Sequence, residues 1–149
     1  MKYLAVIFFF GIILISFNSC KKYSDVKNTG NSVSIIGNWE LEKVSGSIPP
    51  INYPSGNGNI LAFTDSVYKK YTNGNLIKTG SYTIGKDASV VATVGLVIPA
   101  GQFTNRIIFD NDTVSNKIFF YISDNNLTLL SGYFPLDGGS SKLYTRKEN

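Results

Sequence analysis

From Ile35 onward, short runs rich in Val, Ile, Thr, Tyr and Phe alternate with turns built from Gly, Asn and Asp. β-Branched and aromatic residues favour extended backbone, and the turn residues tolerate the positive φ that tight hairpins require. Apart from a short turn before Gly37, no segment of useful length shows the 3.6-residue apolar period of an amphipathic helix. The folded part is therefore predicted to be all-β, with consecutive strands joined mostly by hairpins.

Nine segments are expected to form short strands. Their ranges are 38–44, 59–64, 67–72, 76–84, 89–94, 106–110, 117–123, 127–131 and 142–146. The Asn73-Gly74 pair between two of them is the strongest short hairpin signal. Consecutive antiparallel strands must close on themselves or stack as two sheets to hide their edges. An antiparallel up-and-down barrel of about eight strands is predicted, with a β-sandwich as the alternative.

The first 19 residues have the composition of an export signal. Lys2 precedes an apolar run from Leu4 to Phe17, which spans 14 residues. A positive head, an apolar stretch and small residues before a cut are the parts of a secretory signal, whereas a helix that crosses a membrane needs about 20 apolar residues. Residues 1–19 are expected to be a cleaved signal peptide; a permanent transmembrane anchor is the less favoured alternative.

The segment from Phe17 to Cys20, read Phe-Asn-Ser-Cys, resembles the lipobox of bacterial lipoproteins. In that family the cysteine thiol receives a diacylglycerol and the signal is cleaved just before it. Ser19 suits the small-residue position, while Phe17 departs from the usual aliphatic residue. Cys20 is the only cysteine, and lipidation would remove the difficulty of an unpaired thiol in an exported protein. The resemblance implies membrane attachment through lipid on Cys20; the alternative is ordinary cleavage that leaves a free thiol.

The mature chain divides by composition into a tether and a domain. Residues 20–34 are polar and lack a sustained apolar period, so a flexible tether is expected there, followed by a barrel domain over 35–149. The expected location is the cell envelope, with the lipid in the outer membrane and the domain facing the periplasm, because no acidic cluster follows Cys20.

The net charge of +4 gives little support to nucleic-acid binding. Lys2 is lost with the signal, and Lys21, Lys22 and Lys27 lie close to the anchor, so charges on the domain nearly balance. Nucleic-acid binding requires basic residues clustered on the folded part. The lysines near the anchor are expected either to lie close to anionic headgroups or to be solvated. No nucleic-acid partner is predicted.

Gly37, Asn38 and Trp39, at the start of the first expected strand, resemble the Gly-x-Trp signature of lipocalins. The order of later segments is similar to that in bacterial lipocalin-like lipoprotein domains. Those segments are 59–64, 80–84, 127–129 and 144–146. The resemblance covers about residues 36–147 and implies a barrel in which Trp39 plugs the closed end and Arg146 packs across it. This pair would be structural, and the resemblance leaves the ligand-binding residues unknown.

Conventional catalytic groups are scarce in this chain. It contains no histidine, which excludes Ser-His and Cys-His catalysis and histidine-containing zinc sites. A lipidated Cys20 leaves no thiol nucleophile. Glu40 and Glu42 lie two apart on one strand opposite Trp39, so both are expected to face solvent rather than to act as an acid pair. No catalytic residue, metal site or cofactor is predicted, and the protein is not expected to be an enzyme.

Two Asp-rich segments could suggest calcium. Residues 110–112 and 124–126 lack the glycine and the distant glutamate of a calcium loop, and Asx-rich turns explain them better. Two triplets, Asp65-Ser66-Val67 and Asp112-Thr113-Val114, resemble a bacterial O-glycosylation signature, which makes Ser66 and Thr113 candidate acceptors.

Residues 118–122 are apolar on both faces of their expected strand. Either both faces are covered or the outer face exposes aromatic side chains to a partner, and burial is favoured. Two functions follow. The leading one is a lipid-anchored module that binds a small hydrophobic or amphipathic molecule in its barrel. The rival is an envelope interaction protein with a filled barrel, acting through its surface and loops on an unknown protein partner.

Overall fold

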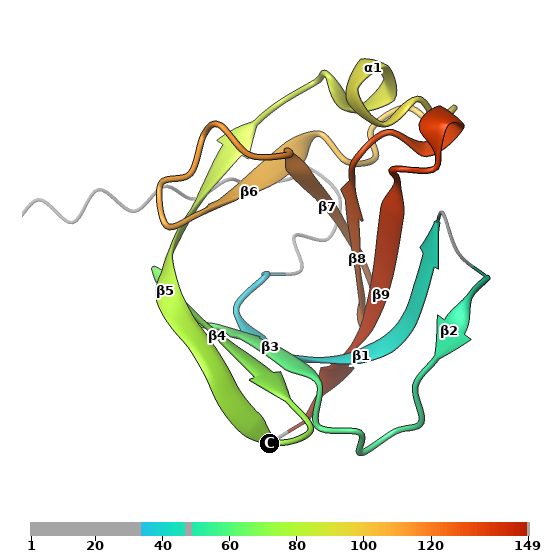
Figure 1. Ribbon diagram of the computed structural model, residues 1–149. Helices are drawn as coiled ribbons and strands as arrows, with labels where there is room; N and C mark the ends of the chain where they lie inside the picture. The colour runs from blue at the N-terminus through green and yellow to red at the C-terminus, as the bar shows by residue number, and fades with distance from the viewer. Residues whose placement is uncertain (1–33, 47–48, 149) are drawn as a thin grey trace, which may run out of the picture. The chain divides into compact units, whose positions relative to one another are not determined.

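The computed structural model describes residues 34–46 and 49–148 (Figure 1). The predicted signal peptide 1–19, the candidate lipidation site Cys20 and all of the predicted tether except Ser34 lie outside the described residues.

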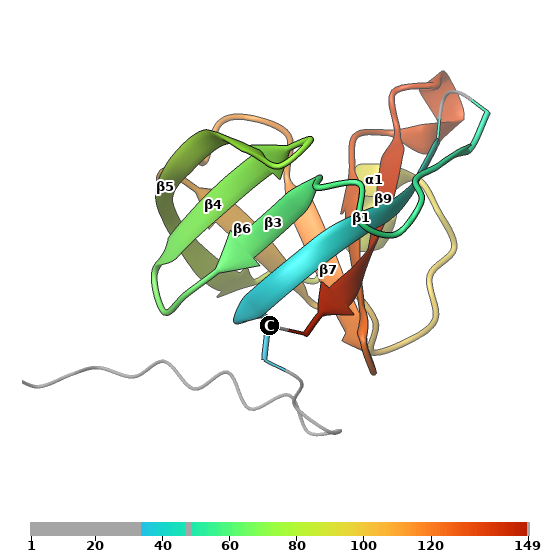
Figure 2. The ribbon, with the colours of Figure 1, turned by 90° about the horizontal axis from the view of Figure 1, so that it is seen from below.

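Eight antiparallel strands form a closed barrel (Figures 1 and 2). They are β1 (Gly37–Gly46), β3 (Ile60–Phe63), β4 (Val67–Thr72), β5 (Asn75–Lys86), β6 (Asn105–Phe109), β7 (Ile118–Ser123), β8 (Asn126–Ser131) and β9 (Ser140–Lys147). Each strand pairs with the next, and pairing of β1 with β9 closes the sheet. A ninth strand, β2 (Ile51–Asn52), pairs with β1 alone. The prediction of an up-and-down barrel of about eight strands is confirmed over the alternative sandwich, and the arrangement fits a lipocalin-like barrel.

The hairpin signals in the sequence correspond to real turns. Asn73 and Gly74 have φ of 50° and 80° and join β4 to β5. Asp124 has φ of 51° and, with Asn125, joins β7 to β8. Positive φ at these positions matches the right-handed twist of the flanking strands, which is why Asn, Asp and Gly are needed there.

The segment 89–94, expected to be the most apolar strand, is instead a short helix, α1 (Val90–Val94). Gly95 ends the helix with φ of 71°, a left-handed conformation that glycine adopts without steric cost. Val90 and Val94 are buried, whereas Val91 is 51% exposed, and residues four apart share one helix face. The strand prediction was wrong because valine favours extended backbone and five residues are too few to display a helical period.

Asp87 anchors the start of the α1 region. Its carboxylate accepts hydrogen bonds from the backbone N–H and hydroxyl of Ser89 at 2.9 and 2.6 Å. The same carboxylate forms ion pairs with Lys117 at 2.9 Å and with Arg106 at 3.5 Å. These contacts, led by the Ser89 hydroxyl, hold the pKa of Asp87 well below its usual range.

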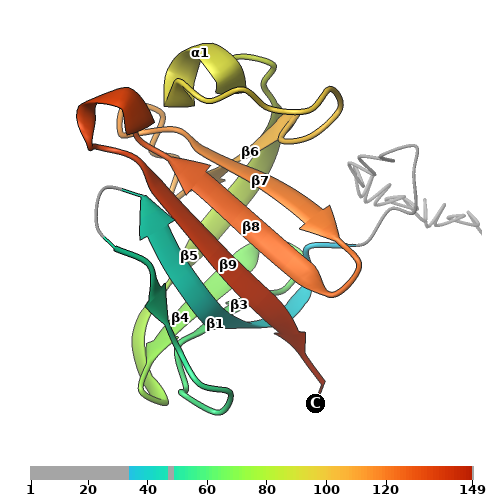
Figure 3. The ribbon, with the colours of Figure 1, turned by 90° about the vertical axis from the view of Figure 1, so that its right-hand side faces the viewer.

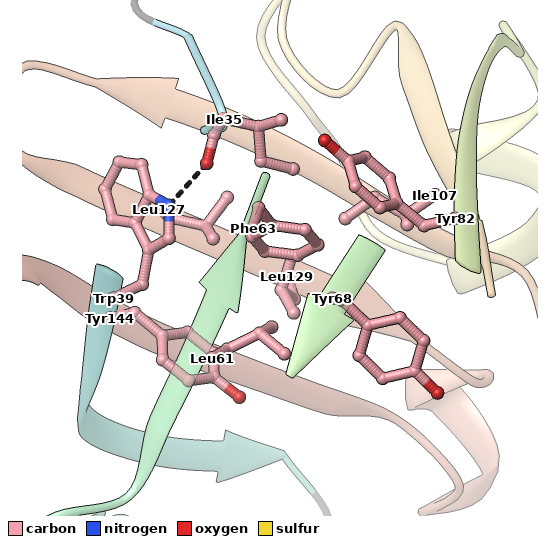
Figure 4. Packing of buried hydrophobic residues seen from close by; sticks show 10 residues of the cluster. All are labelled: Ile35, Trp39, Leu61, Phe63, Tyr68, Tyr82, Ile107, Leu127, Leu129 and Tyr144. Carbon is pink, nitrogen blue, oxygen red and sulfur yellow. Dashed lines mark hydrogen bonds between the residues drawn. The ribbon is translucent and has the colours of Figure 1, made fainter. Parts of the chain in front are cut away.

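The barrel interior is filled by large side chains, and Figure 4 shows those that are buried. Its buried members are Ile35, Trp39, Leu61, Phe63, Tyr68, Tyr82, Ile107, Leu127, Leu129 and Tyr144. Partly buried Ile84, Phe109, Ile118, Phe120 and others pack against them. Burial of this apolar area supplies the main stabilising term for a domain that contains no disulfide.

A second cluster covers the outer face of β7 and β8. It comprises Val90, Val94, Phe103, Phe119 and Leu130. Phe119 and Leu130 are cross-strand partners in β7 and β8, and α1 supplies the two valines that cover them; Figure 3 shows α1 beyond one end of these strands. The neighbouring Phe120 packs into the barrel interior. The expectation that both faces of residues 118–122 are covered is therefore confirmed: Phe119 is buried, and the other four residues are partly buried.

Candidate functional site

The closed end of the barrel brings together the residues of the Gly-x-Trp signature. Trp39 is fully buried and its indole N–H donates to the carbonyl of Ile35 at 2.7 Å (Figure 4). The guanidinium carbon of Arg146 lies 4.1 Å from the ring centroid of Trp39. Gly37, with φ of 135°, places its Cα so close to Arg146 that an added Cβ would be 2.6 Å from Nη1. The positive φ favours glycine here, and a side chain at this position would displace the guanidinium from its place over Trp39.

Arg146 also holds the segment that leads into β1. Its two terminal nitrogens donate to the carbonyls of Ile36 at 2.9 Å and Ser34 at 2.7 Å. The guanidinium therefore stacks on the indole and satisfies two backbone acceptors at once, a combination that the planar fork of arginine permits. These residues have a structural role at the closed end, and Trp39 lines neither of the two cavities described below.

The opposite end of the barrel is its mouth, where β1 ends at Gly46, β9 begins at Ser140 and the Asn73-Gly74 hairpin lies. A cavity of about 210 Å³ opens at this mouth. The lining of this cavity includes Leu61 and Tyr144 of the interior cluster, and Leu41, which packs against that cluster. We call this space the mouth cavity.

Two lysines line the mouth cavity, Lys70 from β4 and Lys142 from β9. Lys70 is the cross-strand partner of Leu61, and Lys142 is the partner of Leu129. Directly opposed residues of an antiparallel pair project to the same face, and both leucines belong to the interior cluster. The two ammonium groups are therefore carried on the inward face of the barrel wall.

Burial changes the protonation equilibria of two groups at the mouth. Desolvation, followed by the positive charge of Lys70, lowers the pKa of Lys142. Desolvation raises the pKa of the Tyr144 phenol to about 12. Both shifts have the sign expected when the charged form of a group loses contact with water.

A third inward lysine at the mouth already has an acidic partner. Lys78 is the cross-strand partner of Lys70 and forms an ion pair with Asp110 at 2.8 Å. Asp110 also accepts a hydrogen bond from the Tyr68 hydroxyl at 2.8 Å. An added Cβ at Gly80 would clash with the Asp110 carboxylate, so glycine makes room for this cluster. The Asp110 cluster ties β4, β5 and the end of β6 together.

The prediction that Glu40 faces solvent was wrong. Its side chain is only 11% exposed and its carboxylate accepts hydrogen bonds from the backbone N–H of Gly56 at 2.9 Å and of Gly58 at 3.1 Å. Lys147 lies 3.5 Å away. The hydrogen bond from Gly56 is the main cause that lowers the pKa of Glu40. The loop between β2 and β3 folds over β1 and covers this carboxylate, whereas Glu42 remains exposed as expected.

A second, outer cavity of about 510 Å³ lies between that loop and the outer face of β1 and β9. Glu40, Glu42 and Lys147 are among its lining residues, so acidic and basic groups are mixed there. Tyr53 lines both this cavity and the mouth cavity. Because Glu40 is paired and its pKa is lowered, it is unsuited to donate a proton near neutral pH.

The Asp-rich segments form turns. Asp112 accepts hydrogen bonds from the backbone N–H groups of Val114 and Ser115 at 3.0 and 2.9 Å, the geometry of an Asx turn.

Across residues 34–46 and 49–148, no group of three or more His, Cys, Asp or Glu side chains is arranged to hold a metal ion. Ser66 and Thr113 both lie in exposed loops. In the same part of the chain, no helix is long and apolar enough to cross a membrane.

Sequence reasoning missed Lys70 and Lys142. Each lies two residues from a buried tyrosine of its strand, Tyr68 in β4 and Tyr144 in β9. Since side chains alternate between faces with a period of two, this spacing indicates that both lysines project inward.

Comparisons with known protein families, curated proteins and solved structures found no match for this chain.

Proposed function

We propose that this protein is a lipid-anchored, lipocalin-like binding protein of the bacterial cell envelope, which holds a small hydrophobic or amphipathic molecule at the mouth of its barrel. The observation that carries the proposal is the mouth cavity, which lies at the end opposite Trp39 and has Leu41 and Leu61 in its lining. Concave sites with apolar walls and a few polar groups are the usual form of small-molecule sites. The proposed role is non-catalytic.

The proposed anchor is lipid on Cys20, which would hold the barrel at the outer membrane on its periplasmic side. It is supported by the apolar run that precedes this single cysteine. Two or three acyl chains make attachment durable, because each buried methylene contributes about 0.8 kcal/mol. Mass spectrometry of the mature N-terminal peptide is expected to find an acylated cysteine; an unmodified Cys20 thiol would refute the anchor without bearing on ligand binding.

The binding role is tested by identifying the small molecules that co-purify with the protein from its own membrane. The lipidated chain is purified from its native host, and native mass spectrometry and organic extraction are applied in parallel. The expected result is a stoichiometric small molecule that an equally treated preparation of a Leu61→Trp variant lacks, because the larger side chain fills the mouth cavity. An empty protein that also takes up no hydrophobic probe would contradict the binding role.

A second candidate is an interaction protein with a filled barrel. Ten buried side chains occupy the interior, and the mouth cavity of about 210 Å³ is smaller than the roughly 300–1,000 Å³ of sites that enclose drug-sized ligands. The outer face of residues 118–122 no longer supports this candidate, since α1 covers Phe119. Crosslinking in whole cells distinguishes the two candidates: a specific protein partner together with an empty barrel favours the interaction role.

A further inference from the structure

Lys70 and Lys142 indicate which chemical class of molecule the mouth cavity takes. We propose that the cavity binds an amphiphile with an anionic head group, a carboxylate or phosphate, held between the ammonium groups of Lys70 and Lys142 with its apolar chain directed along the barrel mouth. This inference rests on the proposed function and adds the charge of the ligand and the residues that recognise it.

The first argument is that these two charges have no acidic partner. Within residues 34–46 and 49–148, ion pairs join Lys78, Arg106, Lys117 and Lys147 to carboxylates, but none involves Lys70 or Lys142. Neither ammonium donates a hydrogen bond to another residue of this part of the chain. Lys142 is partly buried, so its unpaired charge is costly, and Lys70, which is exposed but lines the same cavity, adds a second charge of the same sign. An anion between them would offset both.

The second argument is that the nearest counter-charge is already engaged. Asp110 lies at the same end of the barrel, but its carboxylate binds Lys78, the Tyr68 hydroxyl and the backbone N–H of Ser81. Glu40 is held by Gly56 and Gly58 on the outer side of β1. The Lys70 and Lys142 pair is thus the part of the mouth whose charge the described chain does not balance.

The third argument is a free hydroxyl in the same cavity. Tyr144 lines the mouth cavity, and its hydroxyl forms no hydrogen bond with the described residues. In Figure 4 the hydroxyl of Tyr144 points away from Trp39. A neutral phenol is a good donor to a carboxylate or phosphate oxygen, and its raised pKa of about 12 keeps the proton in place at neutral pH.

The size and walls of the cavity fit a head group with the first part of a chain. A volume of about 210 Å³ corresponds to roughly seven water molecules at about 30 Å³ each. Leu41 and Leu61 contribute apolar wall to the cavity. Beside the cavity, Leu76 and Ile77 of the β4–β5 hairpin are 53% and 54% exposed, and Leu76 is the cross-strand partner of the cavity residue Tyr71. These two side chains provide apolar surface for the rest of the chain.

The test is calorimetric titration of the lipidated full chain in phosphatidylcholine nanodiscs, with empty nanodiscs as the blank. The probes are octanoate, octyl phosphate, octanol, octyltrimethylammonium and acetate. Octanoate and octyl phosphate are expected to bind at least about tenfold more tightly than octanol, and acetate and the cation are expected not to bind measurably. The preference between the two anions identifies the head group.

Matched variants assign the effect to the inward lysines. Lys70→Met and Lys142→Met are each expected to weaken octanoate binding about tenfold, while Lys142→Arg retains it. Lys69→Met is the control, because Lys69 carries the same charge on the same strand and is exposed like Lys70, but projects to the opposite face and does not line the mouth cavity. Circular dichroism and thermal unfolding verify that each variant is folded.

The outcomes separate this inference from the proposed function. Equal affinity for octanol and octanoate, or equal losses from Lys69→Met and Lys70→Met, would overturn the anionic head group while leaving a binding role intact. Acetate binding as tight as octanoate binding would overturn the amphiphile in favour of a small anion. Absence of binding by every probe would count against the proposed function and this inference together.

Discussion

The guanidinium carbon of Arg146 lies 4.1 Å from the ring centroid of Trp39, and the two residues are direct cross-strand partners in β9 and β1. This contact joins the first and last strands at the seam where the barrel closes. The same guanidinium binds the carbonyls of Ser34 and Ile36, so it also fixes the chain where it enters β1. One side chain therefore stabilises both the closure of the sheet and the closed end.

Arg146→Lys is expected to lower the free energy of unfolding by about 1–3 kcal/mol, because a lysine cannot stack on the indole and donate to two carbonyls at once. Chemical denaturation followed by circular dichroism measures the change. Trp39 is the single tryptophan, so its fluorescence reports the same site. Lys69→Met, which removes an exposed β4 charge that forms no ion pair within the described chain, serves as the control; equal losses for the two variants would contradict the stacking role.

Glu40→Gln is expected to destabilise the protein by about 1–2 kcal/mol at neutral pH, because the neutral amide forms weaker hydrogen bonds with Gly56 and Gly58. Since the folded-state pKa of Glu40 is lowered, its contribution is present above the ordinary pKa of 4.5 and is lost as the pH falls through the folded value. Urea denaturation from pH 7 to pH 3 tests this. Glu42→Gln, two residues along β1 and exposed, should change stability by less than about 0.5 kcal/mol; indistinguishable profiles would refute the assignment.

Val94→Ala is expected to lower stability by about 1–3 kcal/mol, because Val94 is fully buried against the outer face of β7. Val91→Ala is the matched control on the same helix, where the side chain is half exposed. Both changes bring the same gain in helix propensity, so the difference between the two midpoints of thermal unfolding reports burial. A difference near zero would mean that α1 does not cover β7 in solution.

Tyr144→Phe is expected to flatten the loss of stability at alkaline pH. The pKa of the buried phenol is raised from 10.0 to about 12, so the folded state favours the protonated form. Its contribution is fully present below pH 10 and is lost as the pH rises to about 12, by about 2–3 kcal/mol. Denaturation of both proteins between pH 9 and pH 12 measures the difference. Parallel stability curves would show that Tyr144 does not titrate with this shift.

Local patterns predicted most of the strands because turn chemistry and alternation act over a few residues. The Asn73-Gly74 hairpin and the buried Trp39 of β1 follow from such signals. The helix α1 does not, since its valines favour strands and its conformation depends on covering Phe119 and Leu130. The alternating pattern of β4 and β9 contained the inward positions of Lys70 and Lys142. That both line one cavity depends on β4 and β9 lying across the same opening, which only the tertiary structure shows.

The amino-acid sequence alone predicted an all-β domain of hairpins, and it showed the absence of histidine and an apolar run before a single cysteine. It also contained the Gly37, Trp39 and Arg146 positions, because these features depend on residue type and short spacing. Closure of β1 on β9, the burial of Glu40 and the mouth cavity arise from contacts between residues far apart in the chain. Such contacts depend on register and on how loops pack over strands, which no local preference encodes.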